Sequence, residues 1–407
     1  MRAGLRWAAV SALASCALGG GAIGLAKTSA SRNASASQSF TVNVDGVNSK
    51  ANETFFAYFP RSSTVHPGDT VVFHYVGVGE PHTVTLGTLA DKAVAAYVHL
   101  TPKQQHANTP PPALQAADAA LPQLFPQGPG DAIASAADPC YVRGGPPGTA
   151  LCPRSQHEQP AFDGGQSYYN SGWLDANQRW SVHISSGTPP GTYRFFCLLH
   201  REFMNGKLNV VPSSTSIPSP SAQYALGQKQ LAGMETGLDS AVAALRRGKP
   251  PVPNASTPPD SVLAGSGAMV PAQVDEFGPK TIKIPVGGSV TWYFLGDHTI
   301  TFNSNTTDDD VRLNAPDGTV HLNPKAVGPA GGPGEPPPTT GGPKSGIHLK
   351  VVASSTWNGR GFHSSGVFVN SFGPPVVEGY KLTFTKAGTY NYICTVHDHM
   401  KGRVVVG

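Results

Sequence analysis

Short segments rich in β-branched and aromatic residues recur along the chain, separated by turns that contain glycine and proline. Residues 71–75, 192–196 and 389–393 are clear examples of such segments. Residues 67–69 (PGD) and 286–288 (VGG) are typical turn sequences between strands. Many short strands with these turns predict an all-β protein built from β-sandwiches.

Four stretches occur twice along the chain in the same order, which predicts two homologous domains. The first pair, PRSSTVHPGDTVVF from Pro60 and PKTIKIPVGGSVTW from Pro279, aligns without gaps. The other pairs are HTVTL and HTITF, SGWL and SGVF, and GTYRFFCLLHREFMNGKLNV and GTYNYICTVHDHMKGRVVV. We expect one β-sandwich domain at residues 37–212 and a second at 269–407.

Three segments interrupt this pattern. Residues 87–165 form an insertion rich in Ala, Pro and Gln in the first domain, and residues 323–345 form a low-complexity loop in the second. Residues 213–268 form a Pro-rich linker, in which apolar spacing predicts a helix over 221–247. We expect its apolar stripe to pack against a domain face, with a partner-binding helix as the alternative. The stripe consists of Leu231, Met234, Leu238, Val242 and Leu245.

The first 36 residues have the pattern of an export signal, with a basic start and an apolar or small run over 7–26. An Ala-x-Ala sequence at 34–36 is a candidate cleavage site. Leu13-Ala14-Ser15-Cys16 resembles a bacterial lipobox, which would make Cys16 a lipidated N-terminus. A cleaved signal peptide, an uncleaved membrane anchor and a lipid anchor at Cys16 therefore stay open. Each places the mature chain outside the cytoplasm, secreted or associated with a bacterial cell envelope.

The amino-acid composition argues against several fold classes and partners. The chain has 407 residues with 47 Gly, 38 Pro and only 13% charged residues, which disfavours coiled coils and large helical bundles. The net charge is +4 and no run of Lys or Arg occurs, so we expect no nucleic-acid partner. An apolar run of about 20 residues is missing beyond the N-terminus, so we expect no internal membrane span.

The five cysteines divide into three groups. Cys16 belongs to the export signal. Cys140 and Cys152 lie in a Pro/Gly-rich stretch and suit a disulfide in an oxidising compartment. Cys197 and Cys394 occupy matching places in the repeat. An unpaired thiol in an exported protein is open to oxidation, which favours a metal on these last two cysteines.

Each half of the chain offers the same set of soft and imidazole ligands. One His comes early, followed by C-x2-H-x3-M in the first half and C-x2-H-x2-M in the second. Two imidazoles and a thiolate with a weak thioether form the set preferred by blue-copper sites, whereas Met is a poor ligand for zinc, the alternative metal. We therefore expect two type 1 copper ions, held by His82, Cys197, His200 and Met204 and by His298, Cys394, His397 and Met400.

These motifs resemble those of the cupredoxins, the family of plastocyanin, azurin and amicyanin. The second C-x2-H-x2-M, preceded by Gly388-Thr389-Tyr390, has amicyanin-like spacing, and the first has one residue more. The resemblance implies a Greek-key β-sandwich with one type 1 copper in each domain, and one-electron transfer without substrate turnover. It also implies that His200 and His397 reach the surface in apolar patches, where electrons enter and leave.

Multicopper oxidases and copper nitrite reductases also join cupredoxin domains, so an enzyme is a rival class. Oxidases need several His-x-His pairs, whereas this chain has one, His397 and His399, of which His397 is already a copper ligand. We therefore expect an electron carrier rather than an enzyme, with redox proteins of the cell envelope as partners. Copper storage or delivery is the second alternative, but the chain has only five Met and no Met-rich cluster.

Overall fold

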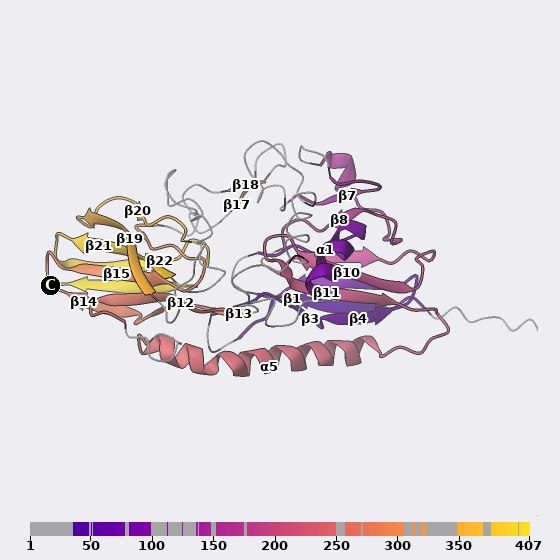
Figure 1. Ribbon diagram of the computed structural model, residues 1–407, viewed down its shortest axis with the longest axis horizontal. Coiled ribbons are helices and arrows are strands. Elements are labelled where there is room, and N and C mark those ends of the chain that lie inside the picture. Colours follow the sequence, from indigo (N-terminus) through magenta and orange to yellow (C-terminus); the bar gives the residue numbers. More distant parts are fainter. Residues whose placement is uncertain are drawn as a thin grey trace, which may run out of the picture. The chain divides into compact units, whose positions relative to one another are not determined.

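β-Strands are the predominant secondary structure in the part of the chain that the computed structural model describes (Figure 1). The described residues are 36–48, 50, 52–77, 81–98, 112, 124, 136, 138–147, 152–174, 177–249, 257–269, 272–304, 312–314, 320–322, 348–368, 376–397 and 399–407. The predicted export signal with Cys16, residues 323–345 and about half of the insertion lie outside them. Residues 37–407 group into one compact unit.

The first half of this unit, residues 37–212, contains two sheets. One has the strand order β3-β1-β5-β9, with β1 parallel to β5, and the other has the order β4-β11-β10-β6-β8-β7. The bounds of the first sheet are β1 Ser39–Val44, β3 Tyr58–Phe59, β5 Thr70–Tyr75 and β9 Arg179–His183. Those of the second are β4 Ser62–Val65, β6 Thr85–Leu86, β7 Cys140–Val142, β8 Tyr168–Asn170, β10 Gly191–Cys197 and β11 Arg201–Val210.

The second half, residues 269–407 with the strand before it, repeats this arrangement. One sheet has the order β19-β21-β15-β12-β13-β2 and the other β14-β23-β22-β16-β20, beside a short pair β17-β18. The first comprises β2 Glu53–Phe55, β12 Ser261–Met269, β13 Ala272–Gly278, β15 Ser289–Phe294, β19 His348–Trp357 and β21 Val376–Phe384. The others are β14 Thr281–Ile284, β16 Thr301–Phe302, β20 His363–Ser364, β22 Gly388–Ile393, β23 Lys401–Val406, β17 Arg312–Asn314 and β18 Val320–Leu322. The all-β fold expected from the sequence is confirmed.

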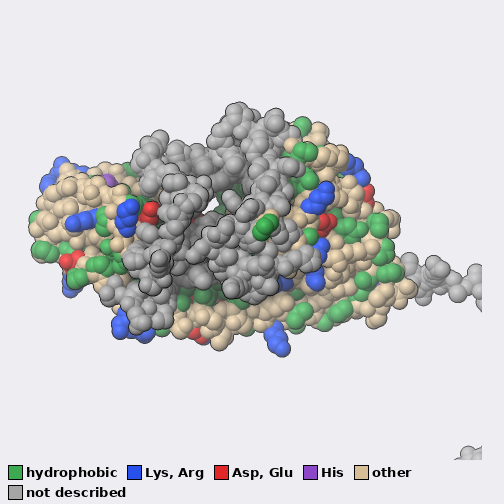
Figure 2. Space-filling view, in the orientation of Figure 1, with side chains coloured by type: hydrophobic (Ala, Val, Ile, Leu, Met, Phe, Trp, Pro, Cys, Tyr) green, Lys and Arg blue, Asp and Glu red, His purple; other side chains and the backbone are tan. Residues whose placement is uncertain are grey.

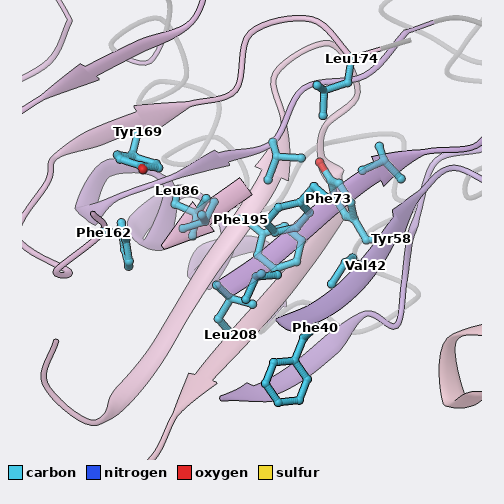
Figure 3. Close-up of a cluster of buried hydrophobic side chains, with 14 of the residues drawn as sticks. Phe40, Val42, Tyr58, Phe73, Leu86, Phe162, Tyr169, Leu174, Phe195 and Leu208 are labelled. Carbon is cyan, nitrogen blue, oxygen red and sulfur yellow. The ribbon is translucent and has the colours of Figure 1, made fainter. Parts of the chain in front are cut away.

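Aromatic side chains fill the space between the two sheets of the first half (Figure 3). Alternate residues of β5 are buried, as expected for a strand with one face on the core. The ring of Phe195 packs edge-on against Tyr58 and Phe73, with centroid distances of 4.8 and 5.0 Å. The Tyr58 hydroxyl donates a hydrogen bond to the Thr83 carbonyl at 2.6 Å, so this core also fixes the chain beside His82.

The described part of the insertion has more structure than its composition predicts. It begins with a helix, α1 (Thr88–Val98), and returns through β7, which adds an edge strand to the sheet beside β8. Cys140 and Cys152 form the expected disulfide, followed by the short 3₁₀ helix η2 (Arg154–Gln156). This small module shares a buried cluster with Phe196 and Leu198, the neighbours of Cys197.

A long helix and one strand pair join the two halves. The helix α5 (Pro220–Arg246) occupies the place where apolar spacing predicts one, and its buried Leu231 packs with Phe55 and Phe59. Nearer its C-terminus, Leu245 packs with a cluster from the second half. Strand β2, from the first half of the sequence, pairs with β13 of the second. Within the described residues, no helix has both the length and the apolar character needed to cross a membrane.

Candidate metal centres

Site 1 brings three of the expected ligands of the first half together. The Nδ1 atoms of His82 and His200 lie 2.9 Å apart, and they lie 3.9 and 3.5 Å from the Sγ of Cys197. His82 and Cys197 are fully buried, whereas His200 is partly exposed. Both imidazoles therefore direct the same nitrogen at one point beside the sulfur.

Site 2 repeats this triangle with residues of the second half. The Nδ1 atoms of His298 and His397 lie 3.1 Å apart, and they lie 3.9 and 3.5 Å from the Sγ of Cys394. All three residues are buried. Two sites built from different residues therefore place their donor atoms almost identically.

The same backbone features position both sites. His82 forms an isolated β-bridge with Leu174 and His298 one with Phe368, so each early histidine is fixed by a segment remote in sequence. The next residue, Thr83 or Thr299, donates its backbone N–H to the cysteine sulfur at 3.3 Å. Its hydroxyl also accepts a hydrogen bond of 2.8 Å from the residue after the cysteine.

Both expected axial ligands are fully buried in the same cores as their cysteines. Met400 precedes β23, and the loop is closed by a hydrogen bond from the Cys394 N–H to the Met400 carbonyl. Met204 lies within β11, which begins at Arg201. A register shift at Cys197 allows this early start.

The donor geometry fits one metal ion in each site. An ion bound at about 2.0–2.1 Å to nitrogen and about 2.3 Å to sulfur holds such donors roughly 3.5–4 Å apart when they share a plane. The sulfur–nitrogen distances of 3.5 and 3.9 Å match this range, and the nitrogen pairs are somewhat closer. Thiolate, imidazole and thioether together are the soft set that copper prefers.

Metal binding requires the thiol to lose its proton, and the two cysteines differ in this respect. Burial raises the pKa of Cys394 to about 12, against the hydrogen bonds that its sulfur accepts. Burial acts in the same direction on Cys197, but the charge and hydrogen bond of His200, together with His82, outweigh it and lower its pKa. In the metal-free protein, thiolate formation is therefore easier in site 1.

The residues that contact the outer ring nitrogens also differ between the sites. In site 1, the Nε2 of His82 lies 3.3 Å from the Oδ2 of Asp45, which is buried and raises the pKa of His82 against the effect of burial. In site 2, the Nε2 of His397 lies 3.6 Å from Asp275 Oδ1 and 3.2 Å from the amide nitrogen of Gln273. In site 1 the carboxylate holds the proton on the outer nitrogen and leaves Nδ1 free for a metal. In site 2 an amide nitrogen lies closer to the outer nitrogen than the carboxylate does.

One sequence expectation is wrong for site 2. His397 does not reach the surface, because Gln273 and Asp275 of β13 cover its outer edge and leave it 1% exposed. His200 keeps part of its surface and packs against the ring of Phe56, with centroids 4.4 Å apart. Only site 1 therefore offers a ligand histidine that is not fully buried.

Part of the chain is similar in sequence to a known protein. Over 70 residues the chain is 39% identical to amicyanin of Paracoccus denitrificans, which covers 15% of this chain and 53% of amicyanin. The fold is cupredoxin-like. The chain spans about half the length of that relative.

An auracyanin and a purple cupredoxin are among the solved structures similar to part of the chain, and both have low TM-scores. Reduced auracyanin from Roseiflexus castenholzii is 20% identical and covers 43% of this chain and 97% of its own, with a TM-score of 0.22. A purple cupredoxin from Nitrosopumilus maritimus is 15% identical and covers 36% and 98%, with a TM-score of 0.17. No family model matches the chain.

Sequence reasoning did not find Asp45, Phe56, Gln273 or Asp275. Each lies far in sequence from the ligands that it contacts, so spacing carries no signal for it. Asp45 alone had a local signal, since Asp45-Gly46 is a turn dipeptide that ends β1.

Proposed function

We propose that this protein is an exported electron carrier with one type 1 copper in each half of the chain. The observation that carries the proposal is the pair of matching triangles, each with two Nδ1 atoms and one cysteine sulfur around a single point. Copper held in this way supplies a one-electron couple. The β-bridges at His82 and His298, and the strands β10 and β22 that lead to the two cysteines, keep the ligand positions constant when the charge changes.

Each site's own residues have separate tasks in this proposal. The histidines bind through Nδ1, and the backbone N–H of Thr83 or Thr299 stabilises negative charge on the sulfur. The aromatic and aliphatic core around Met204 and Met400 excludes water. Nothing in these tasks requires a substrate pocket next to the metal, which favours a carrier over an oxidase or a reductase.

Redox proteins of the cell envelope remain the proposed partners, and the partly exposed His200 is the proposed point of contact. Lys and Arg side chains are spread along the described surface of the face drawn in Figure 2. Copper storage or delivery is the second candidate, but buried ligands behind strands favour retention of the ion over its exchange.

The visible and EPR spectra of the copper-loaded full chain test this proposal. Charge transfer from thiolate to copper(II) should give an intense colour, together with two copper ions per chain. Cys197→Ser and Cys394→Ser should each remove about half of the colour, and the double variant all of it. A colourless wild-type chain that holds two copper ions would contradict the proposal.

A further inference from the structure

The strand pair between β2 and β13 joins the surroundings of the two sites. Thr54 lies opposite Gln273 in this antiparallel pair, with Phe55 opposite Ala272. Thr54 and Phe55 have no exposed surface, and Asp275 has 2%. A buried segment of the first half of the chain thus lies directly beside the strand that covers His397.

Asp45 connects this segment to site 1. One carboxylate oxygen, Oδ2, lies 3.3 Å from the Nε2 of His82. The other, Oδ1, accepts a hydrogen bond of 2.6 Å from the backbone N–H of Phe55. Gly77 makes room for the carboxylate, because a Cβ at that position would collide with the Asp45 side chain.

Asp275 connects the same segment to site 2. The Thr54 hydroxyl donates a hydrogen bond of 2.6 Å to the Oδ2 of Asp275. The Oδ1 of the same carboxylate lies 3.6 Å from the Nε2 of His397. From His82 to His397, the connection therefore consists of Asp45, the Phe55 N–H with the adjoining Thr54, and Asp275. We call these four residues the carboxylate bridge.

Although the two halves of the chain match, only the connection from His82 to His397 has these carboxylates. Gly265 takes the place of Asp45 in the second half. Asp45 follows the last residue of β1 that pairs with β5 and has a φ of 64°, and Gly265 follows the last residue of β12 that pairs with β15 and has a φ of 79°. In the first half, Phe56 takes the place of Asp275, four residues before the aligned proline. The mirror-image connection, from His298 to His200, therefore lacks both carboxylates.

We propose that the two metal sites exchange an electron within the chain through the carboxylate bridge. This inference rests on the proposed function. The copper(I) ion of one site is oxidised to copper(II) while the copper(II) of the other is reduced to copper(I), and no bond or proton changes place. Covalent and hydrogen bonds couple distant redox centres better than open van der Waals gaps. Three of the four non-covalent contacts of the bridge are within hydrogen-bond distance, at 3.3, 2.6 and 2.6 Å, and the fourth, between Asp275 and His397, is 3.6 Å.

The ligand histidines of the two sites differ in burial, and this difference determines how electrons reach each site. His397 is covered, whereas His200 is partly exposed, so an external partner reaches site 1 more easily than site 2. Site 2 therefore gains and loses its electron through site 1. The second copper acts as an internal one-electron store for the first.

A rapid-reduction experiment on the fully copper-loaded chain tests the bridge. A photochemical reductant delivers less than one electron per chain, and freeze-quenched EPR follows the two copper(II) signals, each assigned from a single-cysteine variant. The wild type should show electron redistribution between the sites with a rate independent of protein concentration. Thr54→Val should slow this step by about tenfold, because it removes one hydrogen bond of a connected chain.

Two matched variants and a second readout complete the test. Thr54→Ser keeps the hydroxyl and should restore the rate. Thr188→Val removes a buried hydroxyl hydrogen bond of 2.8 Å to the Phe162 carbonyl, away from the bridge and from both sites, and should leave the rate unchanged. In the diamagnetic copper(I) protein, NMR should show the Nε2 protons of His82 and His397 protected from exchange.

Redistribution that depends on protein concentration, or Thr54→Val as fast as Thr54→Ser, would overturn the bridge while the proposed function stands. A copper-loaded wild-type chain without colour would instead overturn the proposed function itself.

Discussion

At the residue scale, the two sites share their ligands but not the groups around them. The threonine after each early histidine is the closest shared feature, since its N–H contacts the sulfur and its hydroxyl fixes the residue after the cysteine. Around this constant frame, Asp45 contacts one site through His82 and Asp275 the other through His397. We therefore expect similar copper coordination and different reduction potentials.

Thr83→Val should disturb site 1 alone. Valine has nearly the same shape, but it leaves the buried N–H of Leu198 without its acceptor, which costs about 1–3 kcal/mol of unfolding free energy. The EPR signal that Cys197→Ser removes should shift, whereas the other signal should not. Thr299→Val is the matched variant, because it removes the acceptor of the Thr395 N–H and should shift only the second signal. Equal shifts of both signals in either variant would contradict this separation of the sites.

Glu53 should make stability depend on pH. Burial raises its pKa from 4.5 to about 7, with further contributions from Glu235, Asp239 and Glu276. Because the folded pKa is above the unfolded one, the favourable contribution is complete below pH 4.5 and is lost as the pH rises through about 7. The loss is about 3 kcal/mol.

Glu53→Gln is the control for this prediction, because its amide oxygen can still accept the hydrogen bond from Asn48. Urea unfolding of both proteins between pH 4.5 and 8 gives the difference in unfolding free energy. That difference should grow with pH in favour of the variant. A constant difference would show that folding does not shift the pKa of Glu53.

At the element scale, α5 is the helix that holds both halves together. Its buried positions include Gln223, which pairs with the backbone of Thr64, and Gly227, which lies against the backbone of Phe59 and Pro60. The helix begins with an N-cap at Ser219, whose side chain accepts a hydrogen bond from Ala222. The contact at Gly227 is closer than any side chain permits.

Alanine substitutions in α5 should therefore have opposite effects. A Cβ at Gly227 would lie 2.6 Å from the Pro60 nitrogen, so Gly227→Ala should destabilise the protein by about 1–3 kcal/mol. Gly233 has no atom within 4 Å of such a Cβ, so Gly233→Ala should stabilise the helix by about 1 kcal/mol. Thermal unfolding measures both. A stabilising Gly227→Ala would show that the helix does not pack on Phe59 and Pro60.

Local patterns predicted the elements that carry the ligands but not those that surround them. The strand before Cys197 and the helix α5 follow from β-branched runs and apolar spacing within a few residues. Helix α1 and strand β7 do not, because the Ala-rich segment and the short cysteine strand gain their stability from packing on the sheet. The start of β11 before Met204 depends on a register shift, which pairing across strands determines.

At the scale of the whole molecule, the pairing of β2 with β13 explains the largest departure from the sequence prediction. In one domain alone, the edge strand β13 would leave Gln273 and Asp275 at the side of the sheet. In the full chain β2 covers that edge, and His397 is buried behind it. In the proposed function the two halves therefore work together. Site 1 has a partly exposed ligand histidine, and site 2 has only buried ones.

A spectroelectrochemical titration of the copper-loaded full chain shows whether both sites carry an electron. We expect reversible uptake of two electrons per chain, in two one-electron steps with different midpoints, each step removing about half of the thiolate-to-copper absorbance. Cys197→Ser and Cys394→Ser should each leave one of the two steps in place. Uptake of a single electron per chain, or bleaching of the colour that reoxidation does not reverse, would contradict this expectation.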